Sequence, residues 1–127
     1  MLTAIGLAAI EDDAILLVLK KGVWILPGGK PSHNESDTTC LAREIGEELP
    51  EASFTIGECY GDFEGITPHG NEMICVTVFL GTVSGDITPA AEISDARRFT
   101  KDELAEVPTS EITRQIIAAL IRDEILK

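Results

Sequence analysis

The chain has 127 residues, 44% of them hydrophobic and 25% charged, a balance typical of one folded domain over residues 1–127 rather than of a disordered protein. Its net charge of −12 argues against a nucleic-acid-binding surface, but allows a phosphate substrate if a divalent cation lies between protein and phosphate. No apolar run is long enough to cross a bilayer and the first residues lack the basic segment of a secretory signal, so we expect a cytoplasmic protein.

Three strands are predicted at the start of the chain. The apolar segments Leu2–Ile10 and Ala14–Lys20 are separated by the acidic turn residues 11–13. A third segment, Val23–Leu26, is stopped by Pro27-Gly28-Gly29, because proline and paired glycines end regular structure. The beginning of the chain therefore predicts short strands joined by tight turns.

A helix is predicted from Thr38 to Leu49. Ser36 and Asp37, just before it, are residue types that cap helix N-termini. Pro50 ends the helix, since the residue before a proline is disfavoured in the α region.

The second half of the chain predicts three more strands and a closing helix. The strands are Phe54–Tyr60, Met73–Val83 and Ala96–Thr100, and a polar, glycine-rich loop, Gly61–Asn71, separates the first two. Thr109 or Ser110 caps the final helix. One face of that helix is apolar, with Ile112, Ile116, Ile117 and Leu120. Strands on both sides of one helix, with a second helix at the end, predict an α/β layered sandwich with a central mixed sheet.

The cysteines and histidines form no catalytic pattern. Cys40, Cys59 and Cys75 have no metal-ligand spacing, and their odd number indicates reduced thiols that act as small buried hydrophobic residues. Neither His33 nor His69 lies in a nucleophile motif. His69, in a loop, is expected to be solvated, with contact to a substrate as the alternative.

The predicted helix is electrostatically unfavourable. Glu44, Glu47 and Glu48 lie at positions i, i+3 and i+4, so like charges share one face. They also lie in the last turns, where the helix dipole disfavours carboxylates. Gly46 costs roughly 1 kcal/mol more than alanine inside a helix. A helix selected only for stability would not have this composition.

A divalent cation would explain this arrangement. The helix also has an apolar stripe, formed by Leu41, Ile45 and Leu49. At about 100° per residue, Glu44 and Glu48 fall beside the stripe and Glu47 lies further out. Convergent carboxylates repel one another unless a cation joins them, and ligation by oxygen alone favours Mg²⁺ or Mn²⁺. The alternative is a solvated acidic face in which Arg43 is a local salt-bridge partner.

Six residues of this region share one spacing pattern. Gly29, Glu35, Arg43, Glu44, Glu47 and Glu48 match G-x5-E-x7-R-E-U-x-E-E, where U is aliphatic. With each residue type used at about 7%, the six positions recur by chance at roughly one in ten million starting points. The segment Gly29 to Glu51 resembles the Nudix box of MutT-like hydrolases, and the preceding Trp24–Gly29 resembles the usual approach to it. One departure is that Leu49-Pro50-Glu51 stands where the family has x-G-U, so we expect the end of the helix to be altered and the metal site kept.

The resemblance implies roles for these residues. The carbonyl of Gly29 and the carboxylates of Glu44, Glu47 and Glu48 would hold Mg²⁺ or Mn²⁺, and the three glutamates with Arg43 would form the catalytic set. Arg43 would orient a glutamate, most plausibly Glu47, and Glu35 would pair with Arg43 in a structural role.

The reaction implied is attack of water on phosphorus with a glutamate as general base. The base would be Glu44, Glu48 or, outside the box, Glu92, for which an exposed loop acid is the equal alternative. Lys30, Glu92 and Arg97 are the candidate substrate-binding residues. Lys20, Lys21 and Arg98 are further basic candidates, whereas Trp24 and Phe99 are expected to pack in the core rather than stack on a base.

The substrate implied is a nucleoside diphosphate linked to another group. The small size favours a nucleoside triphosphate. ADP-ribose and NDP-sugars are the second choice, for which Pro68 is a weak indication. A Nudix-fold module that binds a nucleotide without hydrolysing it is the alternative from another class. The partners expected are therefore a small nucleotide and no membrane or nucleic acid, with the chain a monomer or homodimer.

Overall fold

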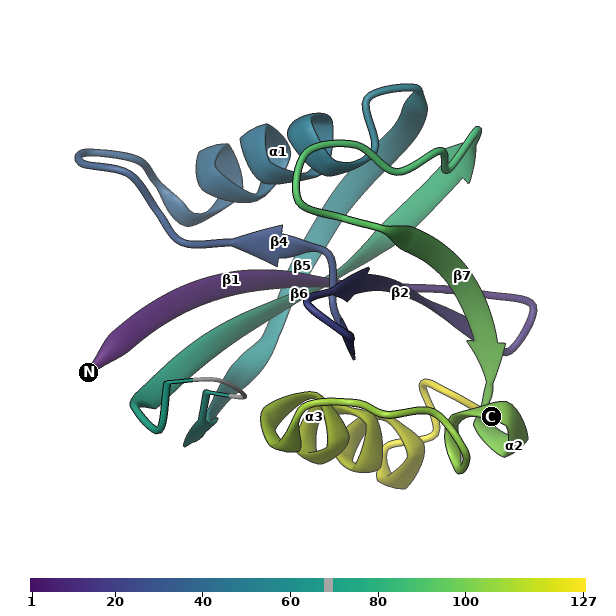
Figure 1. Ribbon diagram of the computed structural model, residues 1–127. Coiled ribbons are helices and arrows are strands. Elements are labelled where there is room, and N and C mark those ends of the chain that lie inside the picture. The colour runs from purple at the N-terminus through teal and green to yellow at the C-terminus, as the bar shows by residue number, and fades with distance from the viewer. Residues whose placement is uncertain (68–69) are drawn as a thin grey trace.

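Seven strands form a mixed sheet between helical layers in residues 1–67 and 70–127, the part of the chain that the computed structural model describes (Figure 1). The strands are β1 (Leu2–Glu11), β2 (Ala14–Lys20), β3 (Val23–Ile25), β4 (Gly28–Gly29), β5 (Ala52–Ile66), β6 (Met73–Gly85) and β7 (Asp95–Thr100). The helices are α1 (Asp37–Glu48), α2 (Lys101–Leu104) and α3 (Glu111–Arg122). Helix α1 covers one face and α3 the other, which confirms the predicted α/β sandwich with a central mixed sheet (Figure 1).

Strand β1 lies at the centre of the sheet. It runs parallel to β6 and pairs antiparallel with β2 at its C-terminal end. On the edge away from β6, Ile5 and Gly6 pair with Gly29 and Gly28 of β4. Strand β4 in turn contacts α1, so the sheet places the glycine pair beside the helix (Figure 1).

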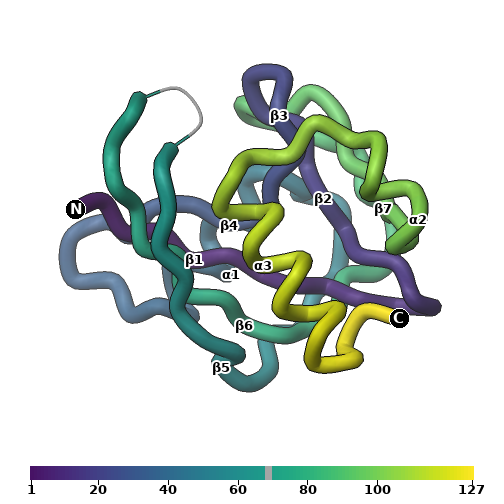
Figure 2. The backbone as a smooth tube through the Cα atoms, turned by 90° about the horizontal axis from the view of Figure 1, so that it is seen from below, coloured from purple at the N-terminus to yellow at the C-terminus, as the bar shows by residue number. Residues whose placement is uncertain are grey.

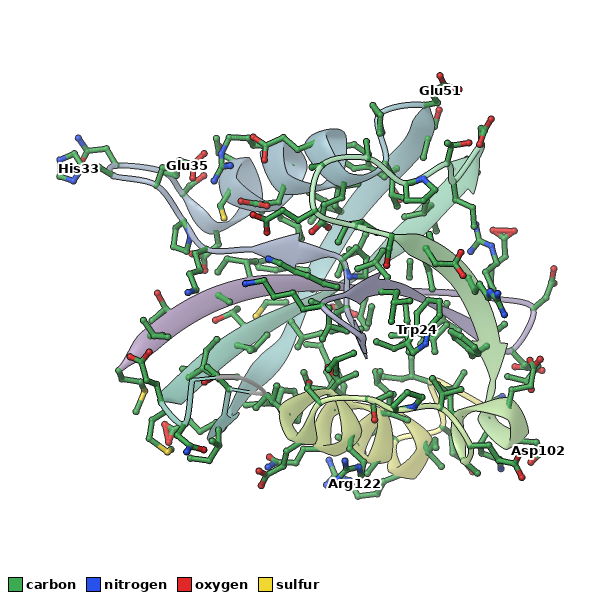
Figure 3. All side chains as sticks on the ribbon, in the orientation of Figure 1. Trp24, His33, Glu35, Glu51, Asp102 and Arg122 are labelled. Atoms are coloured by element: carbon green, nitrogen blue, oxygen red, sulfur yellow. The ribbon has the colours of Figure 1, made fainter. Side chains whose placement is uncertain are left out.

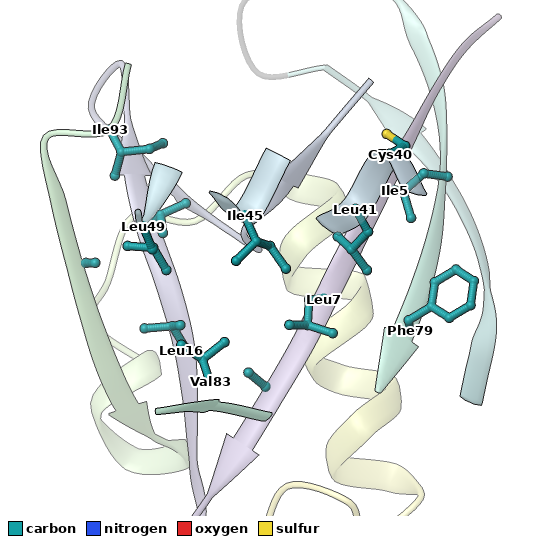
Figure 4. Packing of buried hydrophobic residues seen from close by; sticks show 13 residues of the cluster. Ile5, Leu7, Leu16, Cys40, Leu41, Ile45, Leu49, Phe79, Val83 and Ile93 are labelled. Atoms are coloured by element: carbon teal, nitrogen blue, oxygen red, sulfur yellow. The ribbon is translucent and has the colours of Figure 1, made fainter. Parts of the chain in front are cut away.

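The layer under α1 is a closed apolar core. Leu41, Ile45 and Leu49 are fully buried and pack in one cluster with Leu7 of β1 and Leu16 of β2 (Figure 4). This packing fixes which way the helix faces. The neighbouring positions on the helix are therefore held at the border of the core.

The opposite face of the sheet packs against α3. Side chains alternate between the faces of a strand, so Ile15 and Leu17 of β2 point away from the α1 core. They join Ile116 and Leu120 of α3 in a second cluster. Seen from below, α3 lies across β1 (Figure 2). Because β2 is buried on both faces, its sequence is a continuous hydrophobic run rather than an alternating one.

Two expectations about the second half are corrected. The predicted loop Gly61–Asn71 is wrong up to Ile66, because β5 continues and pairs with β6 as far as the pair Ile66–Met73. Two register shifts between Ile56 and Gly61 keep this glycine-containing strand on its neighbour. The short helix α2 was not predicted; Thr100 and Glu103 form a capping box at its start.

No helix in the described ranges has the length and apolar character to span a membrane.

The helix limits and aromatic residues agree with the sequence. Ser36 caps α1 and Ser110 caps α3, each through its side chain. The last backbone bond of α1 is donated by Leu49, directly before Pro50. Trp24 and Phe99 are buried against each other with ring centroids 4.9 Å apart, as expected of core residues (Figure 3).

The expectation for the cysteines holds only in part. All three thiols are free. Cys40 is fully buried, as predicted, but Cys75 is half-buried and Cys59 is exposed on β5.

Candidate active site

Helix α1 presents its three glutamates at graded depth. Glu48 is 5% exposed, beside the apolar stripe. The side chain of Glu44 is 19% exposed and that of Glu47 is 53% exposed. Glu47 is the most exposed of the three, as the helical period predicts.

The paired glycines bring backbone against two of these carboxylates. The N–H of Gly28 donates to Oε1 of Glu48 at 3.0 Å. A Cβ on Gly29 would lie 2.5 Å from Oε2 and 2.7 Å from Oε1 of Glu44, so a larger residue there would displace the Glu44 carboxylate. The Cys40 thiol donates to the Gly29 carbonyl at 3.8 Å. The strand and the helix thus approach closely only where side chains are absent.

Arg43 ties the loop before α1 to the glutamates. Its Nε and Nη2 donate to the two oxygens of Glu35 at 2.6 and 2.9 Å, a bidentate pair. Its Nη1 donates to Glu44 at 3.0 Å and to Glu47 at 3.2 Å, and Nη2 also reaches the Lys30 carbonyl. The bond from Arg43 lowers the pKa of Glu35 to about 2, so this carboxylate stays ionised at neutral pH. The predicted Glu35–Arg43 and Arg43–Glu47 contacts are both present.

A cleft of about 620 Å³ extends from α1 towards α3. What we call its charged end is lined by Lys20, Lys21, Lys30, Glu44, Glu47, Glu48 and Glu92. What we call its apolar end is lined by Ala4, Leu26, Ile74, Val76, Ile112 and Ile116, and the polar residues Thr67, Glu72, Ser110 and Thr113 also line the cleft. These aliphatic residues come from β1, β6, α3 and the segment after β3, and no local motif indicated them, because only the fold brings them together.

The predicted substrate-binding residues do not all meet at this cleft. Lys30 and Glu92 line it. Arg97 is not among its described lining residues: it binds Asp95 at 3.0 Å and lies over the Trp24 ring at 5.9 Å. Strand alternation turns position 97 of β7 towards Trp24, so Arg97 does not line the described part of the cleft.

Of the other basic and histidine candidates, Lys20 and Lys21 line the charged end, whereas Arg98 and His33 do not. Arg98 donates to the Val83 carbonyl at 2.6 Å. His33 is exposed at the tip of the loop before α1, away from the sheet (Figure 3). His69 and Pro68 lie outside the described residues.

Sequence comparison agrees with this geometry. The family model described as NUDIX domain matches residues 2–120, nearly the whole chain. The chain belongs to the Nudix family. Comparison with curated protein sequences gives no match.

Two solved structures share the Nudix fold with this chain over almost their full length. A MutT NUDIX hydrolase from Burkholderia pseudomallei is 26% identical, with 92% of this chain and 95% of that chain covered and a TM-score of 0.80. A MutT protein from Methanosarcina mazei Go1 is 20% identical, with coverage of 97% and 94% and a TM-score of 0.83. Together with the family match, these similarities identify an enzyme that hydrolyses pyrophosphate bonds.

Nudix hydrolases generally use divalent metal ions, and the donors here suit one. The Gly29 carbonyl and three carboxylates offer only oxygen, which hard cations prefer. The space left by the missing Cβ of Gly29 lies directly at the Glu44 carboxylate, and the buried Glu48 carboxylate faces the same cleft. Within residues 1–67 and 70–127, no three Asp, Glu, His or Cys side chains are grouped closely enough to hold a metal ion. In this arrangement Arg43, and not a cation, binds the carboxylates of Glu44 and Glu47.

Glu48 is the glutamate of this Nudix site whose pKa is raised. Burial raises its pKa from 4.5 to about 7, with Glu44 adding to the increase and the Gly28 N–H opposing it. A buried carboxylate without a cation is unfavourable when charged. In the metal-free protein, burial therefore disfavours the ionised form of Glu48.

This shift predicts a pH-dependent stability of the metal-free enzyme. The folded-state pKa of Glu48 is raised above the unfolded value. The stability that the protonated carboxyl contributes is therefore fully present below pH 4.5 and is lost as the pH rises through about 7. A shift of this size corresponds to at most about 3 kcal/mol. Glutamine does not ionise, so the free energy of unfolding of Glu48→Gln should rise relative to that of wild type by about 1–3 kcal/mol between pH 5 and pH 8. Urea unfolding with EDTA at each pH measures this, and a difference that does not change with pH would contradict it.

Proposed function

We propose that this Nudix enzyme is a Mg²⁺- or Mn²⁺-dependent pyrophosphohydrolase of nucleoside triphosphates. The observation that carries the proposal is the two-ended cleft. Its charged end combines lysines for phosphate with glutamates for a cation, and its apolar end can take the flat faces of a nucleobase. A nucleoside triphosphate likewise has a charged triphosphate at one end and a flat nucleobase at the other.

The residues proposed to hold the cation are Gly29, through its carbonyl, with Glu44, Glu47 and Glu48. A divalent cation bound there would lower the pKa of water and neutralise charge on phosphate oxygens. Arg43 would hold Glu44 and Glu47 in place, and its bidentate bond to Glu35 would fix the guanidinium.

The other proposed roles concern the substrate and the proton. Lys30 lies at the charged end and would bind phosphate oxygens. A carboxylate at this end, from Glu44, Glu48 or Glu92, would accept a proton as water attacks phosphorus. Glu48 has a pKa raised towards neutral, as a general base requires, whereas Lys20 lowers the pKa of Glu92.

The second candidate is hydrolysis of ADP-ribose or an NDP-sugar. Similar folds occur in the bifunctional NMN adenylyltransferase/ADP ribose pyrophosphatase from Francisella tularensis (19% identical, TM-score 0.67) and in a UDP-X diphosphatase (20% identical, TM-score 0.76). This chain covers 40% and 64% of those chains. Both likenesses show the fold alone.

The test is phosphate-coupled hydrolysis across nucleoside triphosphates, ADP-ribose and NDP-sugars, with Mg²⁺, Mn²⁺ or EDTA. We expect turnover of triphosphates that EDTA abolishes. Preferential cleavage of ADP-ribose or NDP-sugars would favour the second candidate. A protein that binds nucleotide and cleaves nothing with either metal would contradict the proposal.

The free thiols fit a reducing compartment. We therefore propose a cytoplasmic location for this activity.

A further inference from the structure

Lys20 and Glu92 form an ion pair at the charged end of the cleft. Nζ of Lys20 lies 3.1 Å from Oε2 of Glu92, and both side chains line the cleft. The Lys20 side chain is 36% exposed and that of Glu92 is 72% exposed. Water and a ligand therefore have access to both partners.

Glu92 is held in this place by its loop. On one side, the N–H of Ala90 donates to the backbone carbonyl of Glu48 at 2.9 Å. On the other, the N–H of Ser94 donates to the Leu19 carbonyl at 2.9 Å, and Ile93 is buried in the α1 core. The loop thus joins the end of α1 to the end of β2, with Glu92 between the two attachments.

Lys20 is the best placed of the three lysines at this end. It is the last residue of β2 and pairs with Val23 of β3, which fixes its backbone. Lys21 lies in the following turn with a positive φ of 51°. Within the described ranges, neither Lys21 nor Lys30 forms an ion pair, so Lys20 alone among the three already binds an anionic oxygen.

We propose that Lys20 is a specificity residue that binds the terminal phosphate of a nucleoside triphosphate, and that Glu92 occupies Lys20 until this phosphate arrives. The inference rests on the proposed function. A lysine ammonium recognises carboxylate and phosphate alike as anionic oxygens, so one can replace the other. A terminal phosphate carries up to two negative charges near pH 7, whereas each phosphate of an NDP-sugar carries one. The more highly charged terminal phosphate therefore replaces Glu92 on Lys20 more readily, and this exchange favours triphosphates over NDP-sugars.

The first experiment compares two substrates of one nucleoside, so that the base is constant. The pairs are ATP with ADP-ribose, GTP with GDP-mannose and UTP with UDP-glucose, each measured with Mg²⁺. We expect Lys20→Met to lower kcat/KM for the triphosphate about tenfold through KM, the size of one charged contact, and to change the diphosphate substrate less than about twofold. Lys20→Arg keeps the charge and should restore the preference, and Lys101→Met, an exposed lysine at the start of α2, should change neither substrate.

The second experiment separates the exchange from catalysis by measuring binding. The probe is a non-hydrolysable α,β-imido nucleoside triphosphate, titrated into each variant. Glu92→Gln should tighten binding several-fold because Lys20 is released, and Lys20→Met/Glu92→Gln should lose this gain. A gain that persists without Lys20 would overturn the exchange.

The outcomes also distinguish this inference from the proposed function. If wild type cleaves the triphosphates but Lys20→Met lowers kcat/KM for both substrates of a pair equally, or for neither, the role of Lys20 is wrong and the proposed function stands. If wild type cleaves no substrate of any pair, both fail.

Discussion

Replacement of Glu48 by glutamine is expected to lower kcat about 10³-fold, within the range for loss of a general base or of a ligand to a catalytic cation. The amide has the same shape, and its oxygen can still accept the hydrogen bond from Gly28. It lacks the negative charge that holds a cation or accepts a proton. Steady-state hydrolysis of the best triphosphate with Mg²⁺ measures the effect.

A matched control comes from the surface of the same chain. Glu106 is exposed between α2 and α3, and Glu106→Gln removes one negative charge without touching the cleft. Its kcat should equal that of wild type. Retention of more than a tenth of wild-type activity by Glu48→Gln would remove Glu48 from the catalytic set, and a cooperative unfolding transition in that variant excludes misfolding as the cause.

Replacement of Gly28 by alanine is expected to destabilise the protein by about 3–5 kcal/mol, the sum of backbone strain and overpacking. Gly28 has φ +142°, a conformation that residues with a Cβ rarely adopt. The added Cβ would overlap the carbonyl of Ile5 and lie 3.0 Å from the Cα of Gly6, both in the central strand β1. Since these are backbone atoms, no side-chain rotation relieves the contact. Urea unfolding measures the loss.

Gly46 provides the comparison for this prediction. It lies inside α1, and a Cβ there would meet nothing within 4 Å. Gly46→Ala should therefore stabilise the protein by about 0.5–1 kcal/mol, through helix propensity alone. If both alanine variants had the same unfolding midpoint, the close packing of β4 on β1 would not be the reason for Gly28.

The same residues explain why the site is unfavourable for stability. Glu48 is buried with a raised pKa, and the last turn of α1 contains no basic residue. The α1 core offsets this cost, because Leu41, Ile45 and Leu49 are fully buried on the adjacent stripe. A functional site held by a well-packed helix can retain charges that the helix alone would not tolerate.

The sequence alone determined α1 and which of its glutamates lies furthest from the core. Helical periodicity is a local property, so the stripe of Leu41, Ile45 and Leu49 was enough to predict that Glu48 is deep and Glu47 exposed. The Glu35–Arg43 pair followed from the family spacing, since both residues lie within one loop and one helix. The layered fold also followed, because each apolar run needs a partner to bury its face.

The tertiary structure alone decided where distant segments meet. β5 extends to Ile66 because β6 offers backbone partners, and no local signal in the glycine-containing segment reports that pairing. The apolar end of the cleft joins β1, β6 and α3, and the Lys20–Glu92 pair joins β2 to a loop after β6. The position of Arg97 was set in the same way: its surroundings depend on which face of β7 turns towards Trp24, and that is decided by the packing of the whole sheet.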